Sequence, residues 1–293
     1  MTQTSEASDL RTLAHRCHYA LETVHVVGYF APENVAAYEA IGLNGILAYF
    51  PARSAPMGAV TADVVTATFF NFSPALVTMA MDGVWDRLTP AQVLEARHTG
   101  IRQTLVRILG ESRCDEDDVA ELIDLLKTAS AALPVQGRPL FAGHASLPWP
   151  DDAVMALWHG TSLMREHRGD GHVAVLVSNG LDPVEAIVLH GQHANVTKFM
   201  KNTRGWSPEE WDAACDRLRS RGLLAEDGTL TADAVALKER MEEQTLDAHV
   251  APYAALGLEG TRRLLDLAKP IRDAVRTGGG VPSGIVSATS TNT

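Results

Sequence analysis

Residues 165–172 read Arg-Glu-His-Arg-Gly-Asp-Gly-His, so six of these eight side chains are ionisable. Apolar runs at 153–158 and 173–177 flank the segment and should be buried. Buried charge is costly unless it is paired, and paired buried clusters often mark functional sites. The pattern predicts acid–base chemistry or a salt-bridged helix end, and the sequence leaves both open. The candidates are Arg165, Glu166, His167, Arg168, Asp170 and His172.

Histidines also recur along residues 9–29, which have the apolar spacing of an amphipathic helix. His15, His18, Glu22 and His25 follow one another at intervals of three, four and three residues. Such intervals place side chains on one stripe of a helix. The stripe predicts a divalent metal site or a set of groups that share protons. The alternative is a polar helix face in which only one or two of these residues matter.

A single cation, Arg53, lies in a loop rich in proline and glycine at residues 52–58. A guanidinium forms bidentate hydrogen bonds with carboxylates and phosphates, so Arg53 is a candidate for holding an anionic group. It could equally satisfy the last carbonyl groups of a helix.

Composition limits the class of protein that carries these residues. The chain has 293 residues, 46% of them hydrophobic, a net charge of −11 and three cysteines. The length predicts about two domains. The acidic balance counts against DNA binding, because phosphate contacts usually require a basic surface. Widely spaced cysteines, a polar start without a signal peptide and the lack of a long apolar run predict a cytoplasmic protein without membrane spans.

Helical signals dominate, so the predicted fold is mainly α. We expect an N-terminal helical domain at 9–150, a winged-helix-like domain at 151–275 and a disordered tail at 276–293. Residues 134–150 hold four prolines and read as a connector, and Gly169 and Gly171 predict a kink in the helix that follows. Capping patterns begin helices at Thr89, Asp182 and Ser207. Residues 223–231 read as a small β-hairpin around Asp227-Gly228, which gives the order helix, helix, hairpin, helix.

Residues 211–231 resemble the recognition helix and wing of MarR-like proteins. More closely, residues 13–272 resemble the SalK-like helix-turn-helix family of actinobacteria. Three blocks carry that resemblance, 22–33, 49–58 and 165–172, and the third is the most specific. The resemblance implies a scaffold used in specialised, or antibiotic, metabolism and does not specify a reaction.

The resemblance also implies that Glu22, His25, Tyr29 and Arg53 belong to one site with residues 165–172. His159 and His190 join Arg53 and Arg168 as ligand-binding candidates. His15, His18 and His193 lie outside the family pattern and are the candidates for a metal site. The sequence requires no cofactor, and it leaves a divalent metal or haem open.

Three functions follow from these residues. The first is a small-molecule site between the domains with cyclase, lyase, isomerase or hydrolase chemistry, in which histidines and carboxylates move protons and arginines hold an anion. The second is a MarR-like ligand-responsive regulator, although residues 207–220 carry four carboxylates beside two arginines. The third is a carrier protein with the same pocket. A homodimer is compatible with each of them.

Overall fold

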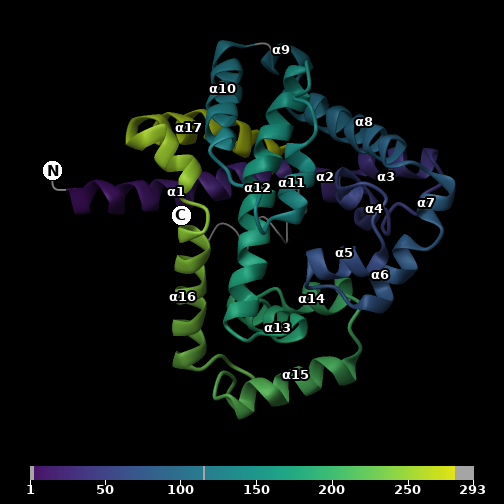
Figure 1. The fold of residues 1–293 in the computed structure, drawn as a ribbon, viewed down its shortest axis with the longest axis vertical. Coiled ribbons are helices and arrows are strands. Elements are labelled where there is room, and N and C mark those ends of the chain that lie inside the picture. The colour runs from purple at the N-terminus through teal and green to yellow at the C-terminus, as the bar shows by residue number, and fades with distance from the viewer. Residues whose placement is uncertain (1–2, 115, 281–293) are drawn as a thin grey trace.

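The computed structural model describes residues 3–114 and 116–280, and it is almost entirely helical (Figure 1). The helices are α1 (Gln3–His25), α2 (Val27–Phe30), α3 (Pro32–Ala40), α4 (Tyr49–Ser54), η1 (Ala55–Met57), α5 (Ala62–Phe69), α6 (Pro74–Met81), α7 (Val84–Arg87), α8 (Pro90–Leu109), α9 (Glu111–Cys114), α10 (Asp117–Ala131), α11 (Pro139–Ala145), α12 (Ala153–Ser178), α13 (Pro183–His193), α14 (Thr197–Thr203), α15 (Pro208–Ser220), α16 (Ala232–Asp247) and α17 (Ala251–Thr277).

The largest core forms around α12, which runs through the middle of the molecule (Figure 1). Apolar residues of α1, α8, α10, α12 and α17 pack together there, and α1 lies along α17. Trp158 is among the largest fully buried side chains of this core. The core therefore joins segments from both sides of residue 150, which was the predicted domain boundary.

A second core joins the end of α12 to α13, α14, α15 and α16. Trp211, Leu218 and Met241 are buried in it. Asp182 and Ser207 form the predicted capping boxes at the starts of α13 and α15. The order α13, α14, α15 is that of a helix-turn-helix, and this segment forms the lower part of the molecule in Figure 1.

The predicted β-hairpin is not supported, because no strand occurs in residues 3–114 and 116–280. Leu224 and Leu230 form one isolated antiparallel bridge, and the Ala225 amide donates to the Thr229 carbonyl at 2.9 Å. Gly228, with φ of 83°, completes the turn. Residues 221–231 join α15 to α16, and the single bridge among them does not extend into a ladder, so no strand pair forms.

Helix α12 runs without a break through Gly169 and Gly171, so the predicted kink is wrong. The two glycines make room for guanidinium groups. A Cβ added at Gly171 would lie 2.2 Å from Nη1 of Arg138, and one at Gly169 would lie 3.0 Å from Nη1 of Arg165. Close approach of another side chain, and not helix termination, explains these glycines.

The predicted connector at 134–150 contains helix α11, which sequence patterns missed. Leu140 and Phe141 are buried, and the Phe141 amide donates to Oδ2 of Asp170 at 2.9 Å. Tertiary packing against α12 thus stabilises a helix too short to persist alone. Of the predicted tail, residues 276 and 277 belong to α17, and residues 281–293 lie outside the described residues.

Helices α3 to α7 form two smaller apolar clusters beside α8. They hold α4 in place, and Arg53 on α4 reaches Glu166 in the middle of α12. Among the described residues no single helix has the length and apolar run of a membrane span, whereas α12 and α13, bent by 108°, pass together on length and composition.

Candidate functional site

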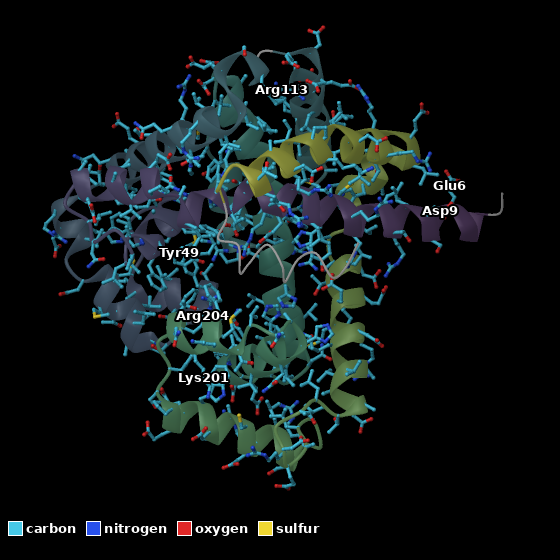
Figure 2. All side chains as sticks on the ribbon, turned by 180° about the vertical axis from the view of Figure 1, so that it is seen from behind. Glu6, Asp9, Tyr49, Arg113, Lys201 and Arg204 are labelled. Atoms are coloured by element: carbon cyan, nitrogen blue, oxygen red, sulfur yellow. The ribbon has the colours of Figure 1, made fainter. Side chains whose placement is uncertain are left out.

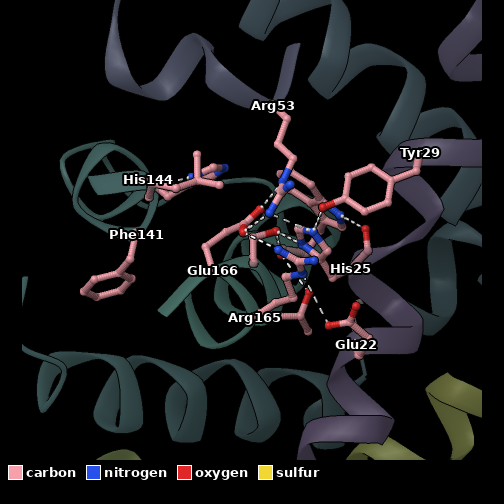
Figure 3. A network of polar contacts seen from close by, with 12 residues as sticks. Glu22, His25, Tyr29, Arg53, Phe141, His144, Arg165 and Glu166 are labelled. Atoms are coloured by element: carbon pink, nitrogen blue, oxygen red, sulfur yellow. Dashed lines mark hydrogen bonds and ion pairs between the residues drawn. The ribbon is translucent and has the colours of Figure 1, made fainter. Parts of the chain in front are cut away.

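The buried carboxylate of Glu166 on α12 is the centre of a polar network (Figure 3). Nε and Nη2 of Arg53 donate to its two oxygens at 3.0 and 2.7 Å, and Nη1 of Arg165 donates at 2.6 Å. Burial alone would raise the pKa of Glu166, but the guanidiniums of Arg165 and Arg53 hold it well below its usual range. Glu166 is therefore a permanently ionised anchor for two cations.

A chain of hydrogen bonds beside this carboxylate joins α1, α2 and α12. Ser162 donates its one hydroxyl hydrogen to the Trp158 carbonyl at 2.8 Å, so its oxygen accepts from Nδ1 of His25 at 2.8 Å. Nε2 of His25 is then an acceptor, and the Tyr29 hydroxyl donates to it at 2.5 Å. The fold thus fixes the imidazole tautomer and aims its basic nitrogen at Tyr29.

Burial sets the resting charge of these groups. It lowers the pKa of His25 well below its ordinary value and raises that of the Tyr29 phenol. At neutral pH the imidazole and the phenol are therefore both uncharged. Oε1 of Glu166 lies 3.7 Å from Nε2 of His25, close enough to stabilise an imidazolium. Tyr29 is half-buried, so its oxygen can also meet a ligand.

Positive charge exceeds negative charge around this network. Arg97 on α8 is 1% exposed and donates to the Ala52 carbonyl at 3.1 Å, and its guanidinium lies 4.9 Å from the Trp158 ring centroid. Its Nη2 has no hydrogen-bond partner, and no carboxylate among the described residues pairs with it. Glu22 supplies the second nearby anion, 3.5 Å from Nε of Arg165 and a quarter exposed. Arg53 and Arg165 thus share the carboxylates of Glu166 and Glu22, whereas the nearby guanidinium of Arg97 has neither as a partner.

Aromatic side chains cover the outer side of Arg53. Its Cζ lies 4.5 Å from the Phe69 ring centroid and 5.8 Å from that of Tyr49. The Tyr49 hydroxyl accepts from Nη1 of Arg53 at 2.8 Å, which leaves its own hydrogen free to donate. The Tyr29 and Tyr49 rings meet edge to face at 5.1 Å. Two phenol groups therefore lie side by side over the guanidinium.

The remaining candidates of the 165–172 block point in other directions. Nδ1 of His167 and Nδ1 of His249 share a hydrogen bond of 2.8 Å, and burial lowers the pKa of His167 to about 3. Nδ1 of His172 bonds to Oγ1 of Thr245 at 3.0 Å. Asp170 accepts from the α11 amide, and burial raises its pKa to about 6. His25, His167 and His172 thus all lie inside the protein but contact different partners.

The ligand-binding candidates other than Arg53 are also dispersed. Arg168 pairs with Glu242 on α16 at 2.5 Å. His159 is 3% exposed and meets the Trp149 ring edge at 5.0 Å, and burial lowers its pKa to about 4. His190 is exposed at the surface of α13. None of these three has a contact with Glu166 that would place it in the network.

The metal candidates do not form a ligand set. His15 lies 3.7 Å from Glu242, His18 is half-buried on α1, and His193 is exposed at the end of α13. Throughout the part of the chain that the structure describes, no three His, Cys, Asp or Glu side chains gather to hold a metal ion. Side chains on one stripe of a helix are too few to surround a metal ion, so a second helix would have to provide the other ligands.

Four residues of the network escaped the sequence patterns. Ser162 lies one helical turn before Glu166, and that spacing was a usable signal. Tyr49 was visible one turn before Arg53 for the same reason. Arg97 and Trp158 gave no signal, because their pairing depends on how α8 crosses α12.

Helix α15 was predicted to be the recognition helix, and its arginines are already paired with carboxylates. Arg217 binds Asp182 and Glu185, Arg221 binds Glu185, and Arg219 binds Asp216. Exposed Glu209, Glu210 and Asp212 add negative charge. Such a surface repels phosphate groups.

Comparison with known proteins adds one finding. The model of a helix-turn-helix family matches residues 14–282, so the chain belongs to this family. The match covers the Glu166 network as well as α13 to α15. No curated protein and no solved structure matches the chain.

Proposed function

We propose that this member of the helix-turn-helix family binds an anionic small molecule beside Arg53 and Glu166 and moves a proton through Tyr29 and His25. The observation that carries the proposal is the surplus of guanidinium over carboxylate groups, with Arg97 fully buried and unpaired. An uncompensated buried charge is costly, and an anionic ligand offsets that cost. The SalK-like resemblance supports a ligand from specialised metabolism.

The proton path follows from the hydrogen-bond directions. An acidic ligand hydrogen moves to Oη of Tyr29 while the phenol hydrogen moves to Nε2 of His25. The imidazolium that forms is stabilised by Glu166 at 3.7 Å, and the ligand oxyanion is stabilised by the nearby guanidiniums. Reversal of both transfers protonates the ligand at another atom, which is an isomerisation, and loss of a leaving group instead completes an elimination.

Deuterium exchange tests the proton path without knowledge of the natural substrate. Enolisable aryl 1,3-diketones are incubated in D2O, and incorporation of deuterium is followed by mass spectrometry. We expect Tyr29→Phe to slow exchange by about 10²- to 10⁴-fold, which is the usual contribution of a positioned acid or base. Tyr38→Phe is the matched control, because Tyr38 is buried in a separate apolar cluster. Exchange at the same rate in the wild type and Tyr29→Phe would contradict the path.

Thermal unfolding tests anion binding separately. Benzoates, phenols and aryl diketones should raise the melting temperature, whereas their methyl esters or ethers should not. Arg53→Met should abolish the difference for the phenols and aryl diketones, and Arg217→Gln, which removes an exposed arginine, should keep it. Equal effects of the charged and neutral members of each pair would defeat the proposal.

DNA binding is the second candidate, because the family is described as helix-turn-helix. Exposed Lys198 and Lys201 on α14 favour it, since the described residues include no carboxylate paired with either. The paired arginines of α15 argue against it. An electrophoretic mobility shift on upstream DNA should show weak binding only, and tight, salt-sensitive, sequence-specific binding would make regulation the principal function.

A further inference from the structure

Arg204 follows α14 directly and has an unusual environment for a cation. Its Cζ lies 4.6 Å from the ring centroid of Phe72 and 5.4 Å from that of Phe199. Nη1 donates to Oγ1 of Thr203 at 2.7 Å, whereas Nε is buried and has no partner. In residues 3–114 and 116–280 no carboxylate forms an ion pair with it. Burial accordingly lowers the pKa of Arg204.

The backbone around Arg204 is held firmly against α6. The Ser73 amide donates to the Arg204 carbonyl at 2.9 Å, and Nε1 of Trp206 donates to the Asn71 carbonyl at 3.0 Å. Gly205 has φ of 75°, and a Cβ there would lie 2.7 Å from Cβ of Leu76. The guanidinium is therefore positioned before any ligand arrives, which lowers the entropy cost of binding.

A row of aromatic rings connects Arg204 to the proton-transfer pair. Phe72 lies 5.5 Å from Tyr49, and Tyr49 lies 5.1 Å from Tyr29, measured between ring centroids. Tyr29, Tyr49 and Arg204 are each half-buried, so none of the three is completely enclosed in the core. Figure 2 shows Tyr49 and Arg204 on the same side of the molecule, and Figure 3 shows Tyr29 beside His25.

The arginines of this row differ in what they can still bind. Arg53 already uses two of its nitrogens, Nε and Nη2, for a bidentate hydrogen bond to the two oxygens of Glu166. Arg165 also donates to Glu166 and lies beside Glu22. Arg204 has no such partner, so its donors are the ones available for a bidentate bond to a ligand carboxylate. The predicted carboxylate clamp at Arg53 or Arg165 is thus better placed at Arg204.

We propose that Arg204 is a specificity-determining residue that binds the carboxylate of a planar aromatic ligand, whose rings lie along Tyr49 and whose acidic group meets Tyr29. This inference rests on the proposed function and names the substrate class of the same site. Aromatic faces select a flat apolar body, and a desolvated guanidinium selects a carboxylate over its neutral analogues.

The test uses 2-naphthoate and its neutral isostere 2-naphthamide as probes of the full-length protein. Isothermal titration should show that the wild type prefers the carboxylate by about 10- to 100-fold, as expected for hydrogen bonds to a charged group. Arg204→Gln should bind the two probes equally, and Arg204→Lys should retain part of the preference. Lys201→Gln, which removes a cation from the exposed face of the same helix, should keep the full preference.

The outcomes separate the two proposals. Retention of the full preference in Arg204→Gln, together with its loss in Arg53→Met, would overturn the role of Arg204 and leave the proposed function standing. Failure of the wild type to bind any aromatic anion would overturn both. Thermal unfolding without ligand shows whether Arg204→Gln is folded. If it is not folded, Arg204→Lys replaces it, because lysine lacks the planar guanidinium and should still reduce the preference for the carboxylate. An unchanged preference in Arg204→Lys would overturn the proposal.

Discussion

Glu166 and Glu185 each lie between two arginines, one pair in the interior and the other at the surface. Glu166 holds Arg53 and Arg165, whose side chains are 9% and 21% exposed. Glu185 holds Arg217 and Arg221, whose side chains are 47% and 35% exposed. The Glu185 side chain is only 5% exposed, but water reaches both of its arginines and screens the pairs, which hold α15 on α13. Glu166 and its two arginines are costly to desolvate, and the proposed anionic ligand would offset part of that cost.

The two regions differ in whether their arginines all have a carboxylate partner, and this determines which of them can attract a further anion. Both arginines of α15, Arg217 and Arg219, pair with neighbouring carboxylates, so neither is free to bind a phosphate group. Near Glu166, by contrast, the buried guanidinium of Arg97 has no carboxylate partner among the described residues. The proposed ligand site therefore lies away from the helices that give the family its description.

The largest expected difference between the two regions is in the free energy of unfolding after neutralisation of Glu166 or of Glu185. We expect Glu166→Gln to lower the free energy of unfolding by about 3–5 kcal/mol, because it leaves buried guanidiniums without their counter-ion. Glu185→Gln should cost about 1 kcal/mol, through a weakened cap and screened ion pairs. Urea unfolding of both variants measures the difference, and equal losses would show that burial does not separate the two regions.

An intermediate effect should appear in the pH dependence of stability. Burial raises the pKa of Asp170 to about 6, so the folded state keeps a proton that the unfolded state releases. Its contribution is therefore present near pH 4 and is lost as the pH rises through 6. Relative to Asp170→Asn, the wild type should lose about 2–3 kcal/mol between pH 4 and pH 7.

The buried histidines contribute the opposite slope, because burial depresses the pKa of groups such as His167. They are the same in the wild type and in Asp170→Asn, so the difference between the two proteins isolates the carboxyl group. Unfolding free energies measured at several pH values in this range provide the test. A constant difference would mean that Asp170 titrates normally.

The smallest effect should follow from freeing one arginine of α15. Asp182→Asn keeps an N-cap side chain for α13 but removes the charge that pairs with Arg217. We expect a stability loss below about 1 kcal/mol, as for other exposed pairs. Non-specific DNA affinity should rise, and its dependence on log salt should steepen by about 1. No change in DNA binding would show that Arg217 does not face the nucleic acid.

The sequence alone determined the features that depend on neighbours within one turn. The N-caps at Thr89, Asp182 and Ser207 form as predicted, because the side chain and the amide it binds are three residues apart. The spacing of His25 and Tyr29 places both on one helical stripe for the same reason. The resemblance brought Glu22 and Arg53 to this site, which their local sequence does not show.

Only the tertiary structure decided where the charges meet. Arg53 and Glu166 are 113 positions apart in the sequence, so no local signal predicts their bidentate pair. The Phe72 and Phe199 rings around Arg204 likewise have no local signal. Gly169 and Gly171 read as helix breakers, whereas Arg165 and Arg138 require the space. Local patterns fix backbone conformation, but the desolvation and pairing of a charge depend on which helices pack around it.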